Sequence, residues 1–124
     1  MQPLSGLRVL DFSTLLPGPL ATLLLAEAGA EVIKIERPGR GDEMRGYQPP
    51  FGSDSANFAL LNRGKRSIAI DLKAADAVER LAPLVATSDV LVEQFRPGVM
   101  DRLGLGYETV RRINPRLVYC AITG

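Results

Sequence analysis

The sequence has 124 residues, of which 46% are hydrophobic and 23% are charged, as is ordinary for one soluble globular domain. Its net charge of +1 lacks the bulk basicity that marks nucleic-acid-binding proteins, and it contains no histidine and one cysteine. Catalysis by histidine, histidine metal sites, a zinc site built from several thiolates and an internal disulfide are therefore excluded.

The first half of the chain predicts two strands around one helix. An apolar strand at residues 7–12 is followed by Pro17-Gly18-Pro19, and a helix rich in leucine and alanine then runs to about residue 28. Gly29 ends this helix well, because glycine readily adopts the left-handed conformation found after a last helical turn. A second strand follows at residues 31–36. Residues 37–53 are polar and rich in Gly, Pro and Arg, which predicts a long loop of the kind that is usually functional or mobile.

The second half continues the same alternation of apolar runs and helical periodicity. A short helix at residues 56–62, with Ser53 or Asp54 near its cap, leads to a strand and then to a longer helix that Pro83 should kink or shorten. In chain order, the expected elements after that short helix are a strand at 67–71, a helix at 74–86, a strand at 90–93, a helix at 107–114 and a strand at 117–122.

Five strands separated by crossover connections predict an α/β fold with a doubly wound, parallel, Rossmann-like sheet. The last strand runs to the end of the sequence without a helix that would cover it. We therefore expect residues 1–124 to be part of a longer protein. The first residues lack the basic flank of a signal peptide, and the longest apolar stretch, around residues 20–30, is too short to cross a bilayer. The sequence predicts a cytoplasmic protein without a membrane or nucleic-acid partner.

Open parallel sheets bind ligands outside the carboxyl ends of their strands. Cations follow three of the predicted strands, and another lies a few residues beyond: Arg37, Lys73, Arg96 and Arg102. Phe95 stands beside Arg96, where an aromatic ring can stack on a purine, and arginine suits phosphate through its planar fork. The start of the helix near Pro19 adds the positive end of a helix dipole. Together these features favour a phosphorylated nucleotide, although each cation alone could be a solvated charge and Phe95 could belong to the core.

A dinucleotide site is the nearest rival. Glu36 ends the second strand, about where an acid that binds ribose belongs. The turn after the first strand, however, lacks the G-x-G-x-x-G glycines that let a backbone approach a pyrophosphate, and no Walker A lysine loop occurs.

Five segments that together cover nearly the whole chain are recognisable: PLSGLRVLDFS, LPGPLATLLLAEAGAEVIKIERPGRGDEMRG, NRGKRSIAIDLK, SDVLVEQFRPGVMDRLGL and NPRLVYCAITG. In order and spacing they resemble the family III CoA-transferases, a family that includes formyl-CoA transferase, carnitine CoA-transferase and the alpha-methylacyl-CoA racemases. It implies that residues 1–124 are the CoA-binding, N-terminal part of the large domain. The positions that it assigns to coenzyme A are Leu15, Arg37, Ile70, Lys73, Gln94, Phe95, Arg96 and Arg102.

The resemblance further implies an enzyme whose catalytic residues lie beyond this chain. In the transferases, a downstream aspartate attacks the acyl-CoA thioester, so that CoA moves to a carboxylic acid without a metal, and two chains interlock as a homodimer. In the racemases, a downstream histidine and aspartate exchange the alpha proton. The long loop after residue 41 favours a transferase, and leucine at Leu16, where formyl-CoA transferases carry glutamine, favours a less polar acyl group. A non-catalytic CoA-binding module remains the alternative if the chain is complete.

Overall fold

The computed structural model describes residues 1–123, so the predicted C-terminal boundary at Gly124 lies outside the described residues. Five parallel strands form the main sheet in the order β5-β2-β1-β6-β7. Their bounds are Arg8–Asp11 for β1, Glu31–Glu36 for β2, Arg66–Ala69 for β5, Val90–Glu93 for β6 and Val118–Ala121 for β7. The chain builds outward from β1 in one direction and then returns to add β6 on its other side, which confirms the doubly wound topology.

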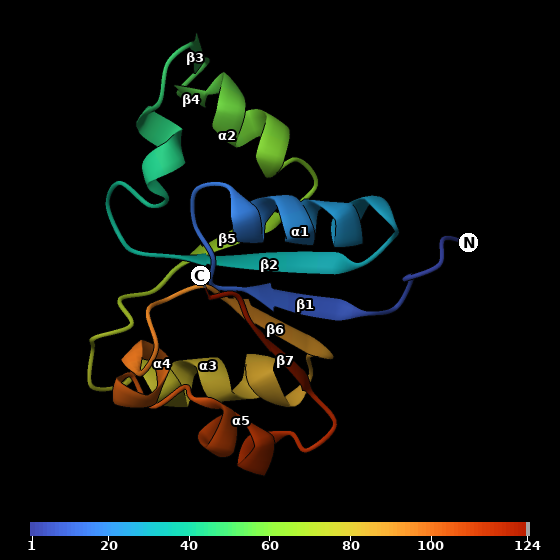
Figure 1. Ribbon diagram of the computed structural model, residues 1–124, viewed down its shortest axis with the longest axis vertical. Helices are drawn as coiled ribbons and strands as arrows, with labels where there is room; N and C mark the ends of the chain where they lie inside the picture. The colour runs from blue at the N-terminus through green and yellow to red at the C-terminus, as the bar shows by residue number, and fades with distance from the viewer. Residues whose placement is uncertain (124) are drawn as a thin grey trace.

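Helices cover both faces of this sheet. Figure 1 shows α1 (Pro17–Glu27) and α2 (Ala56–Leu61) on one side of the sheet, and α3 (Ala77–Ala86), α4 (Val99–Arg102) and α5 (Tyr107–Ile113) on the other. The residues of the inner strands alternate between these two layers, as the pleat of a strand requires. Leu10, Ile33 and Leu91 pack with α3 and α5, while Val9 and Val32 pack on the α1 side.

The loop predicted at residues 37–53 is partly structured. It contains a short 3-10 helix, η1 (Glu43–Gly46), and the first strand of a small antiparallel hairpin, β3 (Pro50–Phe51) with β4 (Asp54–Ser55). Asp42 begins η1 by accepting a hydrogen bond from the N–H of Met44 at 2.9 Å. Elements this short show no hydrophobic periodicity in the sequence, so the sequence indicated a loop by its polar composition alone.

Three further details differ from the sequence predictions. The N-cap of α2 is Ser55, whose hydroxyl accepts from the Phe58 N–H at 2.9 Å, and neither Ser53 nor Asp54 caps it. Helix α3 begins at Ala77 rather than residue 74, because residues 71–76 form turns, and it continues past Pro83 to Ala86 without being shortened there. Helix α4 was not predicted. Within residues 1–123, no helix is both long and apolar enough to cross a membrane.

Candidate functional site

A cavity of about 450 Å³ opens at the carboxyl edge of the sheet. This size lies within the range of small-molecule sites, and segments after four of the strands form its wall. Phe12, Ile35, Glu36 and Arg37 line it from the ends of β1 and β2, and other lining residues come from the segments after β5 and β6. The lining residues are Phe12, Thr14, Ile35, Glu36, Arg37, Gly41, Asp42, Glu43, Ile70, Asp71, Leu72, Lys73, Phe95, Val99 and Leu103.

A second, more polar hollow of about 760 Å³ adjoins the first across the loop after β2. The two share Glu36, Arg37 and residues 41–43. Arg40 and Arg45 add two guanidinium groups to the second hollow. One hollow is therefore lined largely by apolar side chains and its neighbour by charged ones, an arrangement that suits a long ligand with a charged end.

Of the predicted site residues, four line the apolar cavity. Ile70 is buried in its wall, Phe95 is half-buried, and Arg37 and Lys73 are exposed at its rim. Arg37 is anchored, because its Nε donates to the carbonyl of Gly41 at 2.9 Å. Phe95 packs against the core and also lines the cavity, and its stacking on a purine stays a prediction.

The other four predicted residues lie outside the cavity wall. Arg96 and Arg102 are exposed on the loop after β6 and at the end of α4, and they line neither hollow. Leu15 and Gln94 belong to the contact between the turn after β1 and the end of β6. Two of the four cations thus converge on the cavity, and the assignment of all eight residues to coenzyme A stays a prediction.

The start of α1 differs from the expected anion site. Pro17 and Pro19 have no N–H group, and the N–H of Leu20 is bonded to the carbonyl of Leu16 at 2.9 Å. The remaining N–H of this first turn, that of Gly18, donates to Oε1 of Gln94 at 2.9 Å. The N–H groups of Gly18 and Leu20 are thus already bonded and the two prolines have none, so these four positions of the helix start offer no N–H to a phosphate. The expectation of an anion bound by this helix start stays a prediction.

Gln94 instead fastens the turn after β1 to the end of β6. Its Nε2 donates to the carbonyl of Thr14 at 2.6 Å, while its Oε1 accepts from Gly18. A Cβ at Gly18 would stand 2.1 Å from Cβ of Ser13 and 2.6 Å from Oε1 of Gln94, so glycine is required for this close approach. The strand order reverses between β1 and β6, where doubly wound sheets bind their ligands, and Gln94 joins the two segments that border this point.

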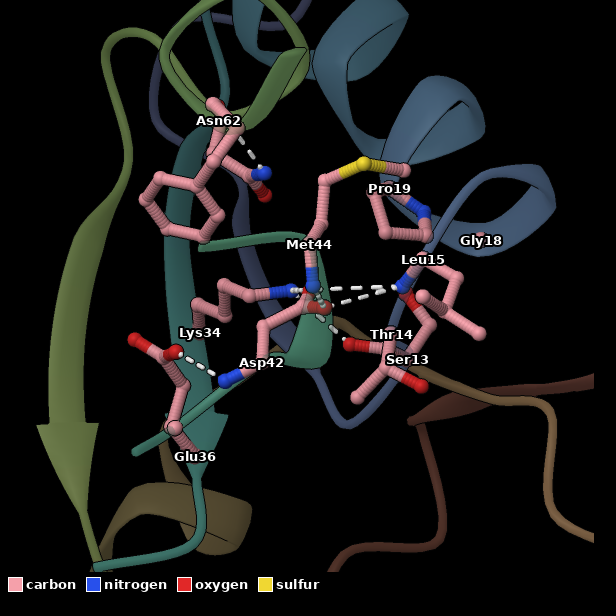
Figure 2. Close-up of polar contacts among 12 residues, drawn as sticks. Ser13, Thr14, Leu15, Gly18, Pro19, Lys34, Glu36, Asp42, Met44 and Asn62 are labelled. Atoms are coloured by element: carbon pink, nitrogen blue, oxygen red, sulfur yellow. Dashed lines mark hydrogen bonds and ion pairs between the residues drawn. The ribbon is translucent and has the colours of Figure 1, made fainter. Parts of the chain in front are cut away.

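Sequence reasoning missed a buried network of charges behind the cavity. Lys34 and Asp42 form an ion pair at 2.9 Å with side chains 1% and 0% exposed, and Figure 2 shows them between β2 and the turn after β1. Asp11, also fully buried, accepts from Thr22 at 2.6 Å and contacts Lys65 at 3.3 Å. A lysine within the apolar run of β2 was the available signal, because a buried lysine requires a partner.

The two acidic strand ends have structural roles. Asp11 also accepts from the backbone N–H of Ser13 at 2.8 Å and from its hydroxyl, and these bonds shape the turn after β1. Asp71 accepts from the N–H of Lys73 at 3.0 Å in the turn after β5. Burial lowers the pKa of Lys65 to about 8, and the neighbouring Asp11 opposes that change.

Glu36 lies at the boundary of the two hollows and is not free to bind ribose. Arg45 donates to both of its carboxylate oxygens, at 2.9 and 2.6 Å, and Ser67 and the N–H of Asp42 donate as well. Burial by itself would raise the pKa of Glu36, but these hydrogen bonds outweigh it and lower the pKa to about 2. The Glu36 carboxylate is thus already hydrogen-bonded to other groups of the protein, which argues against a dinucleotide site in which it binds ribose. Among residues 1–123, no group of three or more metal-ligating side chains comes together.

Comparison with known proteins agrees with this geometry. Residues 4–124 match the profile of CoA-transferase family III. The sequence is 47% identical over its whole length to the succinyl-CoA:glutarate CoA-transferase of Mus musculus, of which it covers 29%. It is 48% identical over 98% of its length to the acetyl-CoA:oxalate CoA-transferase of Acetobacter aceti, of which it covers 31%. The crystal structure of the protein Rv3272 from Mycobacterium tuberculosis superposes with a TM-score of 0.93 at 44% identity, over all of this chain and 34% of that one. The chain therefore spans about a third of the length of its relatives.

Proposed function

Because the chain belongs to CoA-transferase family III, we propose that the protein containing it moves coenzyme A from an acyl-CoA to a carboxylic acid. The observation that carries the proposal is the cavity at the carboxyl edge, where Arg37 and Lys73 flank the apolar surface of Ile70 and Phe95. Coenzyme A combines a charged nucleotide with an uncharged pantetheine arm, and the paired polar and apolar hollows suit those two parts.

In this proposal the described residues bind and orient the coenzyme. Arg37 and Lys73 meet the phosphates, and Arg37 is the better placed because its bond to Gly41 limits the freedom of its side chain before binding. Phe95 offers a ring at the cavity wall, and Ile70 supplies the buried apolar floor. Arg96 and Arg102 are exposed and add positive charge on the side of the loop after β6.

The chemical step belongs to an aspartate in the part of the longer relatives that this chain does not span. Its carboxylate attacks the thioester carbonyl and expels the CoA thiolate, which leaves an acyl anhydride. The thiolate then attacks the aspartyl carbonyl, releases the first carboxylic acid and forms an aspartyl-CoA thioester. The acceptor carboxylate then attacks the aspartyl-CoA thioester and expels the CoA thiolate, which gives a second anhydride. The thiolate attacks the acceptor's carbonyl in this anhydride, which forms the new acyl-CoA and releases the aspartate.

A transferase is favoured over the racemase alternative, because the relatives named above are called CoA-transferases. Leu16 is 54% exposed at the start of α1, and an apolar residue there supports an acyl group less polar than formyl or oxalyl. We further propose that the protein acts in the cytoplasm as an interlocked homodimer.

Binding of coenzyme A to the complete protein tests the proposal. In titration calorimetry, Arg37→Ala and Lys73→Ala are each expected to weaken CoA binding by about tenfold, because each removes a charge-assisted hydrogen bond to phosphate. Arg116→Ala is the matched control, since this exposed arginine precedes β7 at the opposite edge of the sheet. Unchanged affinity in both site variants, or an equal loss in the control, would contradict the proposed site.

A further inference from the structure

The turn after β1 contains a backbone conformation that its residue does not favour. Leu15 has a φ of 65°, and among residues 1–123 it is the one residue other than glycine with a positive φ. A branched side chain disfavours this left-handed region, so a leucine persists there only when its surroundings hold it. Such positions gather at binding sites, and this turn also contains Thr14, which lines the apolar cavity.

Asp42 supplies the contact that holds Leu15. The N–H of Leu15 donates to the Asp42 carboxylate, with distances of 3.1 Å to Oδ1 and 3.3 Å to Oδ2. Figure 2 shows the N–H facing this carboxylate while the side chain of Leu15 turns away from it. The bond joins residues 27 positions apart in the sequence, so the loop after β2 determines the shape of the turn after β1.

Lys34 makes it possible for Asp42 to lie in this position. The Asp42 side chain has no exposed surface, and an isolated carboxylate buried in this way would be very unfavourable. Nζ of Lys34 lies 2.9 Å from Oδ2 of Asp42 and donates to the carbonyl of Ser13 at 2.9 Å. Lys34 therefore neutralises the Asp42 carboxylate and also bonds to the turn after β1, at Ser13.

The loop that contains Asp42 and the turn that contains Thr14 belong to the same cavity. Asp42 and Thr14 both line it, although the Asp42 carboxylate itself has no exposed surface. Gln94 fastens the other side of the turn, so that Thr14 and Leu15 are fixed from two strand ends at once. The Leu15 side chain is half-buried and lies next to the cavity wall, at a position that the family resemblance assigns to the coenzyme.

We propose that Asp42, neutralised by Lys34, is a positioning residue that holds Leu15 in its left-handed conformation for coenzyme A binding. The inference rests on the proposed function, because the ligand it concerns is coenzyme A. Asp42 does not touch the reacting atoms. It acts through the backbone of Leu15, which determines where the leucine side chain meets the ligand.

A test must separate this role from simple stability. The single change Asp42→Ala leaves Lys34 buried without a partner, which strongly destabilises a protein, so both residues are changed together. K34M/D42N keeps a carbonyl oxygen for the Leu15 N–H, whereas K34M/D42A removes it, and both pairs are uncharged. Each pair is prepared in the complete protein with and without Leu15→Gly, because glycine adopts a positive φ without help.

The dissociation constant for CoA and the urea midpoint are measured for all four variants and the unaltered protein. We expect K34M/D42A to bind CoA about five- to thirtyfold more weakly than K34M/D42N, as a strain of about 1–2 kcal/mol implies. When L15G is also present, the CoA dissociation constants of the two double variants should agree within about twofold. An effect transmitted through Met44, whose N–H also bonds to Asp42, would persist with L15G.

The outcomes distinguish the two proposals. Equal affinities of the Asn and Ala pairs, or a difference that L15G leaves intact, would overturn the positioning role while CoA binding by the unaltered protein upholds the proposed function. Failure of the unaltered protein to bind CoA would overturn the proposed function, and the positioning role with it.

Discussion

Glu36 allows a test of how the loop after β2 is held against the sheet. Its carboxylate accepts two hydrogen bonds from Arg45 and one each from Ser67 and the N–H of Asp42. The change Glu36→Gln keeps the shape of the side chain but replaces one acceptor oxygen with an NH₂ group. That group would face the Arg45 and Ser67 donors, so the loop that borders both hollows loses its anchor.

The size of the effect follows from the pKa of Glu36. A carboxyl group whose pKa falls from 4.5 to about 2 on folding contributes about 3 kcal/mol to stability at pH 7, at 1.36 kcal/mol per tenfold change in affinity for the proton. Since the pKa is lower in the folded protein, this contribution is present above pH 4.5 and is lost as the pH falls through 2. At pH 3 about 1.5 kcal/mol remains by the same linkage relation.

Urea unfolding at pH 7 and pH 3 measures this directly. Relative to the unaltered protein, E36Q is expected to be less stable by about 3 kcal/mol at pH 7 and by about half as much at pH 3. Glu27→Gln is the control, because Glu27 and Arg63 form an ion pair with side chains about half exposed, and such pairs contribute little. A stability difference that does not change with pH, or a loss in E27Q as large as in E36Q, would refute the reasoning.

Three further changes have definite expected results in the same unfolding assay. Gly18→Ala should destabilise the protein by about 1–3 kcal/mol, because the added Cβ would stand 2.1 Å from that of Ser13, and normal stability would contradict the close approach. Thr22→Val should cost about 1–3 kcal/mol, since it removes the 2.6 Å donor to the buried carboxylate of Asp11, and Thr22→Ser should retain most of that stability. Glu93→Gln should stabilise the protein at pH 7, because burial raises the pKa of Glu93, and this gain should shrink towards zero below pH 4.5, where the carboxyl is protonated in both states. A gain for E93Q that grows as the pH falls would show that the sign is wrong.

The sheet could be predicted from the sequence because each strand is a short apolar run bounded by glycine, proline or polar residues. The run Val32-Ile33-Lys34-Ile35 shows both the strength and the limit of that pattern. It correctly predicts β2, and it says nothing of which residue pairs with the lysine. The partner, Asp42, stands in a loop eight positions later, and hydrophobic periodicity carries no information about such a contact.

The short elements could not be predicted for a related reason. Helix α4 and η1 have four residues each, about one turn, so no apolar stripe can develop along them. Their positions depend on contacts made elsewhere in the fold. Met44 in η1 and Met100 in α4 are buried, and each element packs through its methionine rather than through a repeating pattern.

The candidate site could likewise be predicted only in part. The rule that ligands bind at the carboxyl ends of parallel strands placed Arg37, Lys73 and Phe95 together, since strand order alone determines which segments share that edge. The rule does not determine which polar groups at that edge remain free. Gln94 and Glu36 both stand at strand ends, and both are bonded to the backbone or side chains of neighbouring segments.

At the carboxyl edge of the sheet, some polar groups are bonded within the protein and others remain exposed, and this difference explains the arrangement of the edge. The turn after β1 contains a leucine with a positive φ and leads directly into a helix start with two prolines and a crowded glycine, so by itself this segment has little tendency to adopt its shape. Asp42 from the β2 side and Gln94 from the β6 side supply the bonds that it lacks. Asp42 and Gln94 are thus occupied in shaping this segment, whereas Arg37 and Lys73 at the rim are the cations of the cavity wall that remain exposed to a ligand. Asp42 is buried and these two cations are exposed, so a charged ligand can be bound by them without disturbing the bonds that Asp42 makes to the turn.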